Sequence, residues 1–364
     1  AVVHLSAHHL AFACAAYAVA TTIRQCVTVL ERGFQYSFVD FIRKGMTAGL
    51  QMCLERHGEC LSCTEGAILT HNYAMKRLLI IGCGDVALRA IPLLRGHYRL
   101  YALNRNPEHC GKLRELGVTP VMGDLDNRTS LARISGLADV VLDFAPPQSQ
   151  AITDTRTHHL LAALSAGILP KQIIYISTSG VYGDCAGNYV SETTPLNPQS
   201  NRAKLRVDAE MQIRAWAKRT GVRACILRVP GIYAHDRLPL DRLRAGSPAI
   251  VENEDGFSNH IHADDLARIM VASLRYGKAN RVYHTVDEDE MKMGDYFDAV
   301  ADAFDLSRPP RLPRNEVRQK VSPMMWSFMN ESRRMTNTRM KQELKVRLLY
   351  PTLDHTLVEI KCGT

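Results

Sequence analysis

A short turn near residue 82 carries two glycines at a spacing that could serve the binding of an anion. The segment Gly82-Cys83-Gly84-Asp85-Val86-Ala87 reads G-x-G-x-x-A, follows an apolar run and opens a helix-length stretch. In such a segment the first glycine allows a tight turn, and the second lets a pyrophosphate approach the backbone. The alanine lets helix and strand pack closely, and the helix N-terminus faces the phosphates. The segment therefore predicts dinucleotide binding, with a simple structural turn as the alternative.

The residues after the second apolar run bear on which dinucleotide is bound. An acid at this place would bind the ribose 2′-hydroxyl of NAD. Here Asn104 stands in that position, and Arg105 follows it. Because an arginine can pair with a 2′-phosphate, we expect the cofactor to be NADP, with NAD as the alternative. The alternative is that Arg105 only faces water and has no role in cofactor binding.

Strand-like and helix-like patterns alternate from residue 75 onward. The apolar runs are four to six residues long and almost free of polar residues, which is typical of strands buried on both faces of a parallel sheet. We expect strands at 78–81, 98–103, 118–122, 139–144, 172–176 and 224–227. We expect helices at 85–95, 107–116, 128–136, 149–166 and 202–220, the first of them kinked or shortened by Pro92. This order predicts an α/β fold, a Rossmann-type doubly wound parallel sheet with a small C-terminal substrate domain.

The length of 364 residues, with 46% apolar and 23% charged residues, suggests about two globular domains. Residues 1–74 are rich in Cys and His and lack the alternation, so we expect a non-core extension, with the natural start at Met75. Residues 75–235 are expected to form the NAD(P)-binding domain. Residues 236–357 are expected to form a smaller substrate-binding region, partly interleaved with that domain.

Several motifs together resemble one known family. The fifth strand pattern runs into Ser177-Thr178-Ser179-Gly180-Val181-Tyr182-Gly183, and the third into Gly123-Asp124-Leu125. A further segment reads His262-Ala263-Asp264-Asp265-Leu266-Ala267. These segments resemble the extended short-chain dehydrogenases/reductases of the NAD-dependent epimerase/dehydratase family over about 75–357. The resemblance implies that Asp124 and Leu125 flank the adenine.

The same resemblance assigns residues at the nicotinamide end of the cofactor. Ala145 and Pro146 would touch the nicotinamide-side ribose, and Ser177 would also belong to the cofactor site. Thr178 would be the hydroxyl that polarises the substrate oxygen. Tyr182 could donate a proton nearby, with a packed ring as the alternative.

The chain departs from the family at its catalytic Tyr-x-x-x-Lys. Aligned without gaps, Arg202 replaces the tyrosine and Arg206 replaces the lysine. A shifted alignment places Lys204 at the lysine, but then Ser200 replaces the tyrosine. Because an arginine does not deprotonate in a protein, it cannot act as the general base. We therefore expect an atypical member whose catalytic group comprises Thr178, Tyr182 and the two arginines.

The expected function is redox or epimerase/dehydratase chemistry on a small polar substrate, with a nucleotide sugar as the example. Residues 308–349 hold eleven Lys and Arg and three acids, a difference that equals the whole formal charge of +8. This basic segment suits a phosphate-bearing substrate, although a solvated helix face would look the same. It lacks interleaved aromatics beyond Trp326 and Phe328, so we do not expect nucleic-acid binding. The alternative is a sensor or regulatory protein that binds NAD(P) without turnover.

Other segments bear on location and metals. The apolar run Leu10–Ile23 has fourteen residues, fewer than the roughly 20 that span a bilayer, and no Lys or Arg precedes it. We therefore expect a cytoplasmic protein without a membrane segment, and a homodimer is compatible with the sequence. Cys53, His57, Cys60 and Cys63 have a spacing that could bind a metal. They form one cluster without a second, so we expect no metal site.

Overall fold

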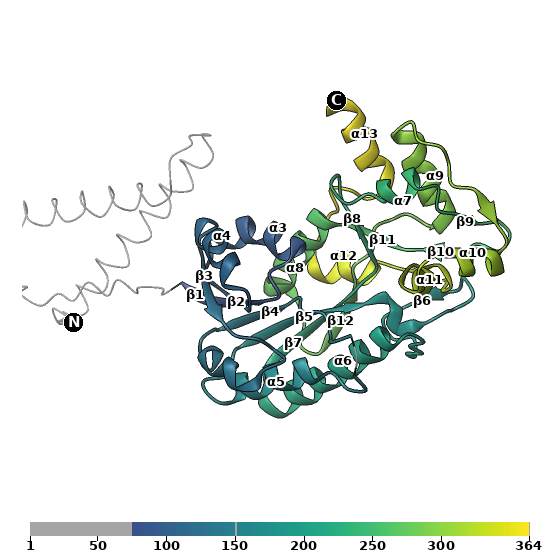
Figure 1. Cartoon of the computed structure of the whole chain (residues 1–364). Coiled ribbons are helices and arrows are strands. Elements are labelled where there is room, and N and C mark those ends of the chain that lie inside the picture. The colour runs from purple at the N-terminus through teal and green to yellow at the C-terminus, as the bar shows by residue number, and fades with distance from the viewer. Residues whose placement is uncertain (1–74, 150, 364) are drawn as a thin grey trace, which may run out of the picture. The chain divides into compact units, whose positions relative to one another are not determined.

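The computed structural model describes residues 75–149 and 151–363 (Figure 1). The strands in this part of the chain are β1 (Lys76–Ile81), β2 (Tyr98–Asn104), β3 (Val118–Met122), β4 (Val140–Asp143), β5 (Gln172–Thr178), β6 (Tyr189–Val190), β7 (Arg223–Val229), β8 (Gly231–Tyr233), β9 (Ala249–Ile250), β10 (Phe257–Ser258), β11 (His260–His262), β12 (Arg281–His284), β13 (Met291–Lys292), β14 (Arg311–Leu312) and β15 (Arg334–Met335). The α-helices are α3 (Asp85–Leu94), α4 (Cys110–Glu115), α5 (Thr155–Ser165), α6 (Asn201–Thr220), α7 (Leu240–Arg244), α8 (Ala263–Tyr276), α9 (Met293–Ala303), α10 (Arg314–Lys320), α11 (Pro323–Met329), α12 (Thr338–Leu344) and α13 (Leu353–Gly363). The 3₁₀ helices are η1 (Pro107–His109), η2 (Arg128–Ile134) and η3 (Ser179–Tyr182).

Seven strands of the described residues form one sheet in the order β12-β7-β5-β4-β1-β2-β3. Every pairing in this sheet is parallel. The chain winds outward from β1 through β2 to β3, then returns to place β4 on the other side of β1. This doubly wound arrangement confirms the predicted Rossmann-type fold. The loops after β1 and β4 meet at the point where the winding reverses, which is where ligands bind in open α/β sheets.

Strand β1 shows why the sheet is buried on both faces. Leu78 and Ile80 belong to one hydrophobic cluster, and Leu79 and Ile81 belong to another. All four side chains are fully buried, because successive residues of a strand point to opposite faces and each face is covered. Helices α3 and α8 cover the first face, and α5 and α6 cover the second (Figure 1).

All six predicted strands are present, but the helices differ in detail. The stretch 107–116 divides into η1 and α4, because Pro107 and the Asn106 cap enforce a separate first turn. The stretch 128–136 forms the 3₁₀ helix η2. Helix α5 begins at Thr155, because the Asp154 carboxylate caps its first turn by accepting from two backbone N–H groups. Helix α3 continues two residues past Pro92.

Residues beyond 235 contribute to the sheet as well as to a separate core. Strand β12 pairs with β7, and α8 packs against α3, so these elements complete the Rossmann layers. A third cluster, centred on Phe297, Val317 and Leu353, holds the remaining C-terminal elements together. The described residues belong to one unit, Ala74–Thr364. The boundary near 235 stays a prediction, and the proposed extension 1–74 lies outside the described residues.

The longest helix of the sheet layers, α6, is fixed by a buried ion pair. The Arg228 side chain on β7 donates to both carboxylate oxygens of Glu210 on α6, at 3.1 and 2.7 Å. The Ser177 hydroxyl on β5 donates to the same carboxylate at 2.6 Å. All three side chains are almost completely buried. Because buried charges require partners, this contact permits one position of α6 against β5 and β7.

We expect Glu210→Ala to lower the free energy of unfolding by about 3–5 kcal/mol, because it leaves the Arg228 guanidinium buried without a counter-charge. Urea denaturation measures this change. The matched control is Asp302→Ala, which removes the carboxylate from an exposed pair with Arg308 and should leave the urea midpoint unchanged. Equal small effects of both substitutions would contradict the assignment.

The predictions about a membrane segment and a metal site concern residues that the structure describes only in part. In the range 75–363 without residue 150, no helix combines the length and apolarity that a membrane span requires. The apolar run Leu10–Ile23 and the cluster around Cys60 both lie outside the described residues.

Candidate functional site

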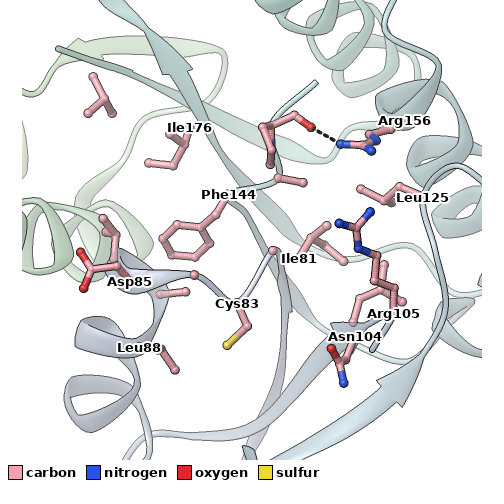
Figure 2. A pocket seen from close by; sticks show the side chains of 18 of the residues that line it. Ile81, Cys83, Asp85, Leu88, Asn104, Arg105, Leu125, Phe144, Arg156 and Ile176 are labelled. Atoms are coloured by element: carbon pink, nitrogen blue, oxygen red, sulfur yellow. Dashed lines mark hydrogen bonds between the residues drawn. The ribbon is translucent and has the colours of Figure 1, made fainter. Parts of the chain in front are cut away.

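A cavity of about 640 Å³ opens at the carboxyl edge of the sheet (Figure 2). Residues from the loops after β1, β2, β3, β4 and β5 and from the start of α6 line it. The thirteen residues that the sequence assigns to the cofactor all line this cavity: Gly82, Cys83, Gly84, Asp85, Val86, Ala87, Asn104, Arg105, Asp124, Leu125, Ala145, Pro146 and Ser177. The structure thus brings them together, and their individual roles stay predictions.

The turn after β1 requires glycine at its first position. Gly82 has a φ of +81°, and a Cβ built on it would lie 2.9 Å from the backbone nitrogen of Ala145. A side chain would therefore push apart the two loops that meet where the sheet reverses its winding. Gly84 is different, because a Cβ built on it would meet no atom within 4 Å. Hydrogen in place of that Cβ leaves the backbone at the start of α3 open to a bound group.

The start of α3 carries an acid whose charge is neutralised. Asp85 accepts from Arg89 at 3.0 Å and from Arg237 at 2.7 Å. Arg89 also bonds Asp264 at 2.9 Å, so α3 is tied to the start of α8. Arg237 itself lines the cavity and comes from the loop after β8. A lone carboxylate at this N-terminus would repel phosphate, and the contacts with Arg89 and Arg237 weaken that repulsion, although Arg89 is shared with Asp236 and Asp264. Sequence reasoning missed Arg237, because nothing in its local pattern places it near residue 85.

The region after β2 is basic. Arg105 makes no hydrogen bond or ion pair with any residue that the structure describes, and Figure 2 shows it beside Leu125. His109 and Lys112 line the same part of the cavity. The Asn104 side chain instead bonds within its own turn, to the backbone of Asn106. The basic side chains therefore offer donors at this end of the cavity.

An arginine that the sequence did not single out connects two of the cavity's loops. Arg156, at the start of α5, donates to both carboxylate oxygens of Asp126 at 2.7 and 2.6 Å. It also donates to the backbone oxygen of Pro146 at 3.0 Å. Arg156 thereby links the loops after β3 and β4, and Figure 2 shows its bond to the second of them. These hydrogen bonds lower the pKa of Asp126, so the pair stays charged at neutral pH.

The opposite end of the cavity holds three of the four predicted catalytic residues. Thr178, Arg202 and Arg206 line it. The Thr178 hydroxyl oxygen accepts from the backbone N–H of Gly180 at 3.3 Å, which fixes the oxygen at the end of β5. The Ser177 hydroxyl donates its hydrogen to Glu210, so it is left only as an acceptor for a ligand.

Tyr182 is placed elsewhere, which corrects the expectation that it donates a proton near Thr178. Its ring is buried and does not line the cavity. Its hydroxyl contacts His284 Nε2 at 2.6 Å and Arg228 Nη1 at 2.6 Å. Burial raises the pKa of Tyr182 to about 12. Tyr182 is therefore a packed ring within a buried polar network, which was the alternative for this residue.

Two arginines of α6, Arg206 and Arg202, differ in burial and in their contacts. Arg206 is buried and donates to the backbone oxygens of Ala145 at 3.1 Å and Ile176 at 2.7 Å, so it holds together the ends of β4 and β5. Arg202 is exposed, and its guanidinium lies 5.8 Å from the centre of the Phe328 ring. Neighbouring protein atoms partly desolvate its guanidinium, and this desolvation, together with the charge of Arg206, lowers the pKa of Arg202. Neither arginine can take a proton from a substrate.

The basic segment 308–349 does not reach this cavity. None of its eleven basic residues lines it. Arg311 pairs with Asp298 at 2.7 Å, Arg333 with Glu331 at 2.7 Å, and Lys341 with Glu288 at 2.7 Å. The acids that pair with Arg311 and Lys341 come from outside the segment, which its sequence alone does not reveal. That this segment suits a phosphate-bearing substrate stays a prediction, and none of its basic residues belongs to the lining of this cavity.

The fold and the glycine turn can be compared with those of known protein families. Residues 90–286, more than half of the chain, match the NAD dependent epimerase/dehydratase family. The chain belongs to this family. The predicted family is therefore confirmed.

Individual relatives resemble the chain over different lengths. A dTDP-glucose 4,6-dehydratase of Mycobacterium tuberculosis (strain ATCC 25618 / H37Rv) is 31% identical over 127 residues, which are 32% of this chain and 38% of that protein. A conserved protein of unknown function from Silicibacter pomeroyi DSS has a solved structure with a TM-score of 0.65 and 27% identity, covering 79% of this chain and 99% of that one. A dTDP-glucose 4,6-dehydratase from Streptomyces venezuelae, solved with NAD bound, has a TM-score of 0.63 and 19% identity over 78% of this chain and 97% of that one. At 19% identity the last comparison shows the fold alone.

A buried acid at the end of β4, which accepts from the backbone of Ala145, gives a pH-dependent prediction. Burial raises the pKa of Asp143 to about 7, although the backbone N–H of Ala145 and the charge of Arg206 oppose this. An unfolded aspartate loses its proton near pH 3.9, so the folded state becomes less stable as pH rises from about 4 to 7. Asp143→Asn stays neutral and keeps an acceptor for Ala145. We expect the free energy of unfolding of the variant to exceed that of the parent protein by about 2–4 kcal/mol at pH 8, and by much less at pH 4.5.

Urea denaturation at both pH values checks this expectation. Asp241→Asn is the control, because that carboxylate is fully exposed on α7 and should show no such difference between the two pH values. A difference between Asp143→Asn and the parent protein that is the same at pH 4.5 and pH 8 would count against a buried, protonated Asp143.

Proposed function

We propose that this protein is an NADP-preferring enzyme that carries out redox or epimerase/dehydratase-type chemistry on a small polar substrate. One observation carries the proposal: a single cavity runs from the Gly82–Ala87 turn to the Thr178 hydroxyl. The first end has the features that a dinucleotide's phosphates require, and the second end presents a fixed hydroxyl. This continuity joins a cofactor site to a place where a substrate oxygen could react.

The described residues fit a bound NAD(P). The open backbone at Gly84 and the N-terminus of α3 would hold the pyrophosphate, and Arg237 lies within the same cavity. Leu125 would lie against the adenine, with its loop fixed by Arg156, and Ala145 would lie against the nicotinamide-side ribose. When bound, the nicotinamide supplies or accepts a hydride.

The preference for NADP rests on charge. Arg105 makes no hydrogen bond or ion pair with a described residue, although its charge contributes to the lowered pKa of Asp126, and it lines the cavity where the adenosine ribose would lie. His109 and Lys112 add donors at the same place. No Asp or Glu occupies the end of β2, so nothing there would repel a 2′-phosphate or select the 2′-hydroxyl.

The proposed chemistry is atypical for the family, because it proceeds without a tyrosine base. Within the described residues, no tyrosine lines the cavity. Thr178 would hold the substrate oxygen, since its oxygen already accepts from Gly180 and its hydrogen is left to donate. A water molecule would then carry the proton, because Arg202 stays protonated and Tyr182 is buried elsewhere.

The substrate class has weaker support. The likeness to dTDP-glucose 4,6-dehydratase favours a nucleotide sugar, although the match spans only 38% of that protein's length. A cytoplasmic location and a homodimer stay predictions of the sequence.

A second candidate is a sensor that binds NAD(P) without turnover. The observation that favours it is the same absence of a phenol from the described cavity lining, together with Arg206, which bonds backbone oxygens as a structural residue does. The retained Thr178 hydroxyl favours the enzyme.

We expect NADP to bind more tightly than NAD, and Arg105→Ala to weaken NADP about tenfold or more while leaving NAD unchanged. The physical reason is the loss of a charge-assisted hydrogen bond to the 2′-phosphate. Fluorescence titration with NADPH and NADH measures both affinities. Arg114→Ala is the matched control, because that exposed arginine on α4 does not line the cavity. Equal affinity of the parent protein for both cofactors would show that NADP is not preferred.

Turnover with NADPH and NADH against a panel of nucleotide sugars and aldehydes tests the enzyme itself. Once a substrate is found, we expect Thr178→Ala to lower kcat by about 100-fold, because a donor to the developing negative charge is lost. Thr178→Ser keeps the hydroxyl and should retain most of the activity. Full activity of Thr178→Ala would refute its assignment. Cofactor binding without any turnover would favour the sensor.

A further inference from the structure

The substrate end of the cavity contains a cation that no acid of the described chain neutralises. Arg202 lies in the first turn of α6 and lines the cavity, and its one recorded contact is the ring of Phe328. Among the described residues no carboxylate or carbonyl oxygen bonds its guanidinium. This contrasts with Arg156, which lines the same cavity and is fully paired with Asp126. A guanidinium left unpaired at a cavity wall offers its donors to a ligand.

A second arginine next to Arg202 also has unused donors. Arg206 is 4% exposed, and its recorded hydrogen bonds all run from Nη1. Its buried Nε has no hydrogen-bond partner in the described residues. An unpartnered N–H on a buried cation is costly unless something fills the site. Two adjacent guanidinium groups therefore face one end of the cavity with donors to spare.

The backbone and the hydroxyl beside these arginines favour negative charge as well. Helix α6 is 20 residues long and has no acid in its first turn. Its cap, Ser200, satisfies only the N–H of Ala203. The positive end of the helix dipole thus lies at Arg202. Thr178 adds a hydroxyl hydrogen that no described acceptor takes.

From this arrangement we infer that the Arg202 end of the cavity binds an oxyanion of the substrate, a carboxylate or a phosphate, beside the Thr178 hydroxyl. The planar fork of arginine matches both anions with two parallel hydrogen bonds. The inference rests on the proposed function, and it narrows the substrate to acidic compounds whose charged group lies next to the reacting oxygen. The position that would hold a phenol in the family thereby serves substrate recognition.

The rival explanation is that Arg202 serves the cofactor. The cavity places Arg202 at the end away from Arg105, and the pyrophosphate has its own donors at α3 and at Arg237. A cofactor role would make NADPH affinity depend on Arg202, whereas an oxyanion site for the substrate would not.

Calorimetric titration of the full chain saturated with NADPH tests the inference. The probes are malonate, inorganic phosphate and the neutral malonamide. We expect the parent protein to bind malonate or phosphate and not malonamide, and the two anions distinguish a carboxylate site from a phosphate site. Arg202→Gln should weaken the affinity for the anion about tenfold or more. The affinity of Arg202→Lys should lie between those of the parent protein and Arg202→Gln, because lysine keeps the charge and lacks the planar fork of arginine. Arg219→Gln, an exposed arginine at the far end of α6, is the matched control.

The outcomes separate the inference from the proposed function. Unchanged NADPH affinity in Arg202→Gln, with anion binding lost, supports the oxyanion site. If Arg202→Gln loses affinity for NADPH to the same extent as affinity for the anion, Arg202 belongs to the cofactor site and the inference of an oxyanion site is overturned. Failure of the parent protein to bind either anion also overturns it. If the parent protein does not bind NADPH, the proposed function fails, and titration without cofactor decides the anion site alone.

Discussion

The buried ion pair between Arg228 and Glu210 is the contact on which the position of α6 depends. It crosses from β7, the neighbour of the edge strand β12, to the helix, and the Ser177 hydroxyl joins it from β5. Glu210 lies one turn beyond Arg206 and two turns beyond Arg202, so the same contact sets where both arginines enter the cavity. A shift of α6 by one residue would expose a buried charge to an apolar layer, which is costly. The rigidity of the substrate end therefore follows from electrostatics in the core.

Charge organises the cavity along its whole length. At the start of α3, Asp85 is paired with Arg89 and Arg237, and Arg89 also bonds Asp236 and Asp264. After β3, Arg156 takes both carboxylate oxygens of Asp126, and Arg105 makes no hydrogen bond to that acid. At the end of β4, the buried acid Asp143 has a pKa that burial raises to about 7. The lining is thus prepared for an anionic cofactor and for an anionic substrate group.

The sequence was sufficient for the sheet and for the cofactor end of the site. Strands buried on both faces leave an uninterrupted apolar run, and the glycine turn is a local pattern, so both can be read along the chain. Contacts between distant segments left no such pattern. Arg237 reaches Asp85 across 152 positions, and Tyr182 turns to His284 across 102. The pairing of the basic segment was hidden for the same reason, because Arg311 and Lys341 bond acids that lie outside it.

The central claim is that one cavity orders the cofactor from Arg105 to Thr178 and leaves Arg202 to the substrate. A crystal structure of the full chain with NADPH tests this most directly. The account predicts the 2′-phosphate at Arg105, the pyrophosphate at the N-terminus of α3, and the nicotinamide beside Thr178, with the Arg202 guanidinium free of any phosphate. A nicotinamide placed away from Thr178, or a cofactor phosphate bound by Arg202, would contradict it.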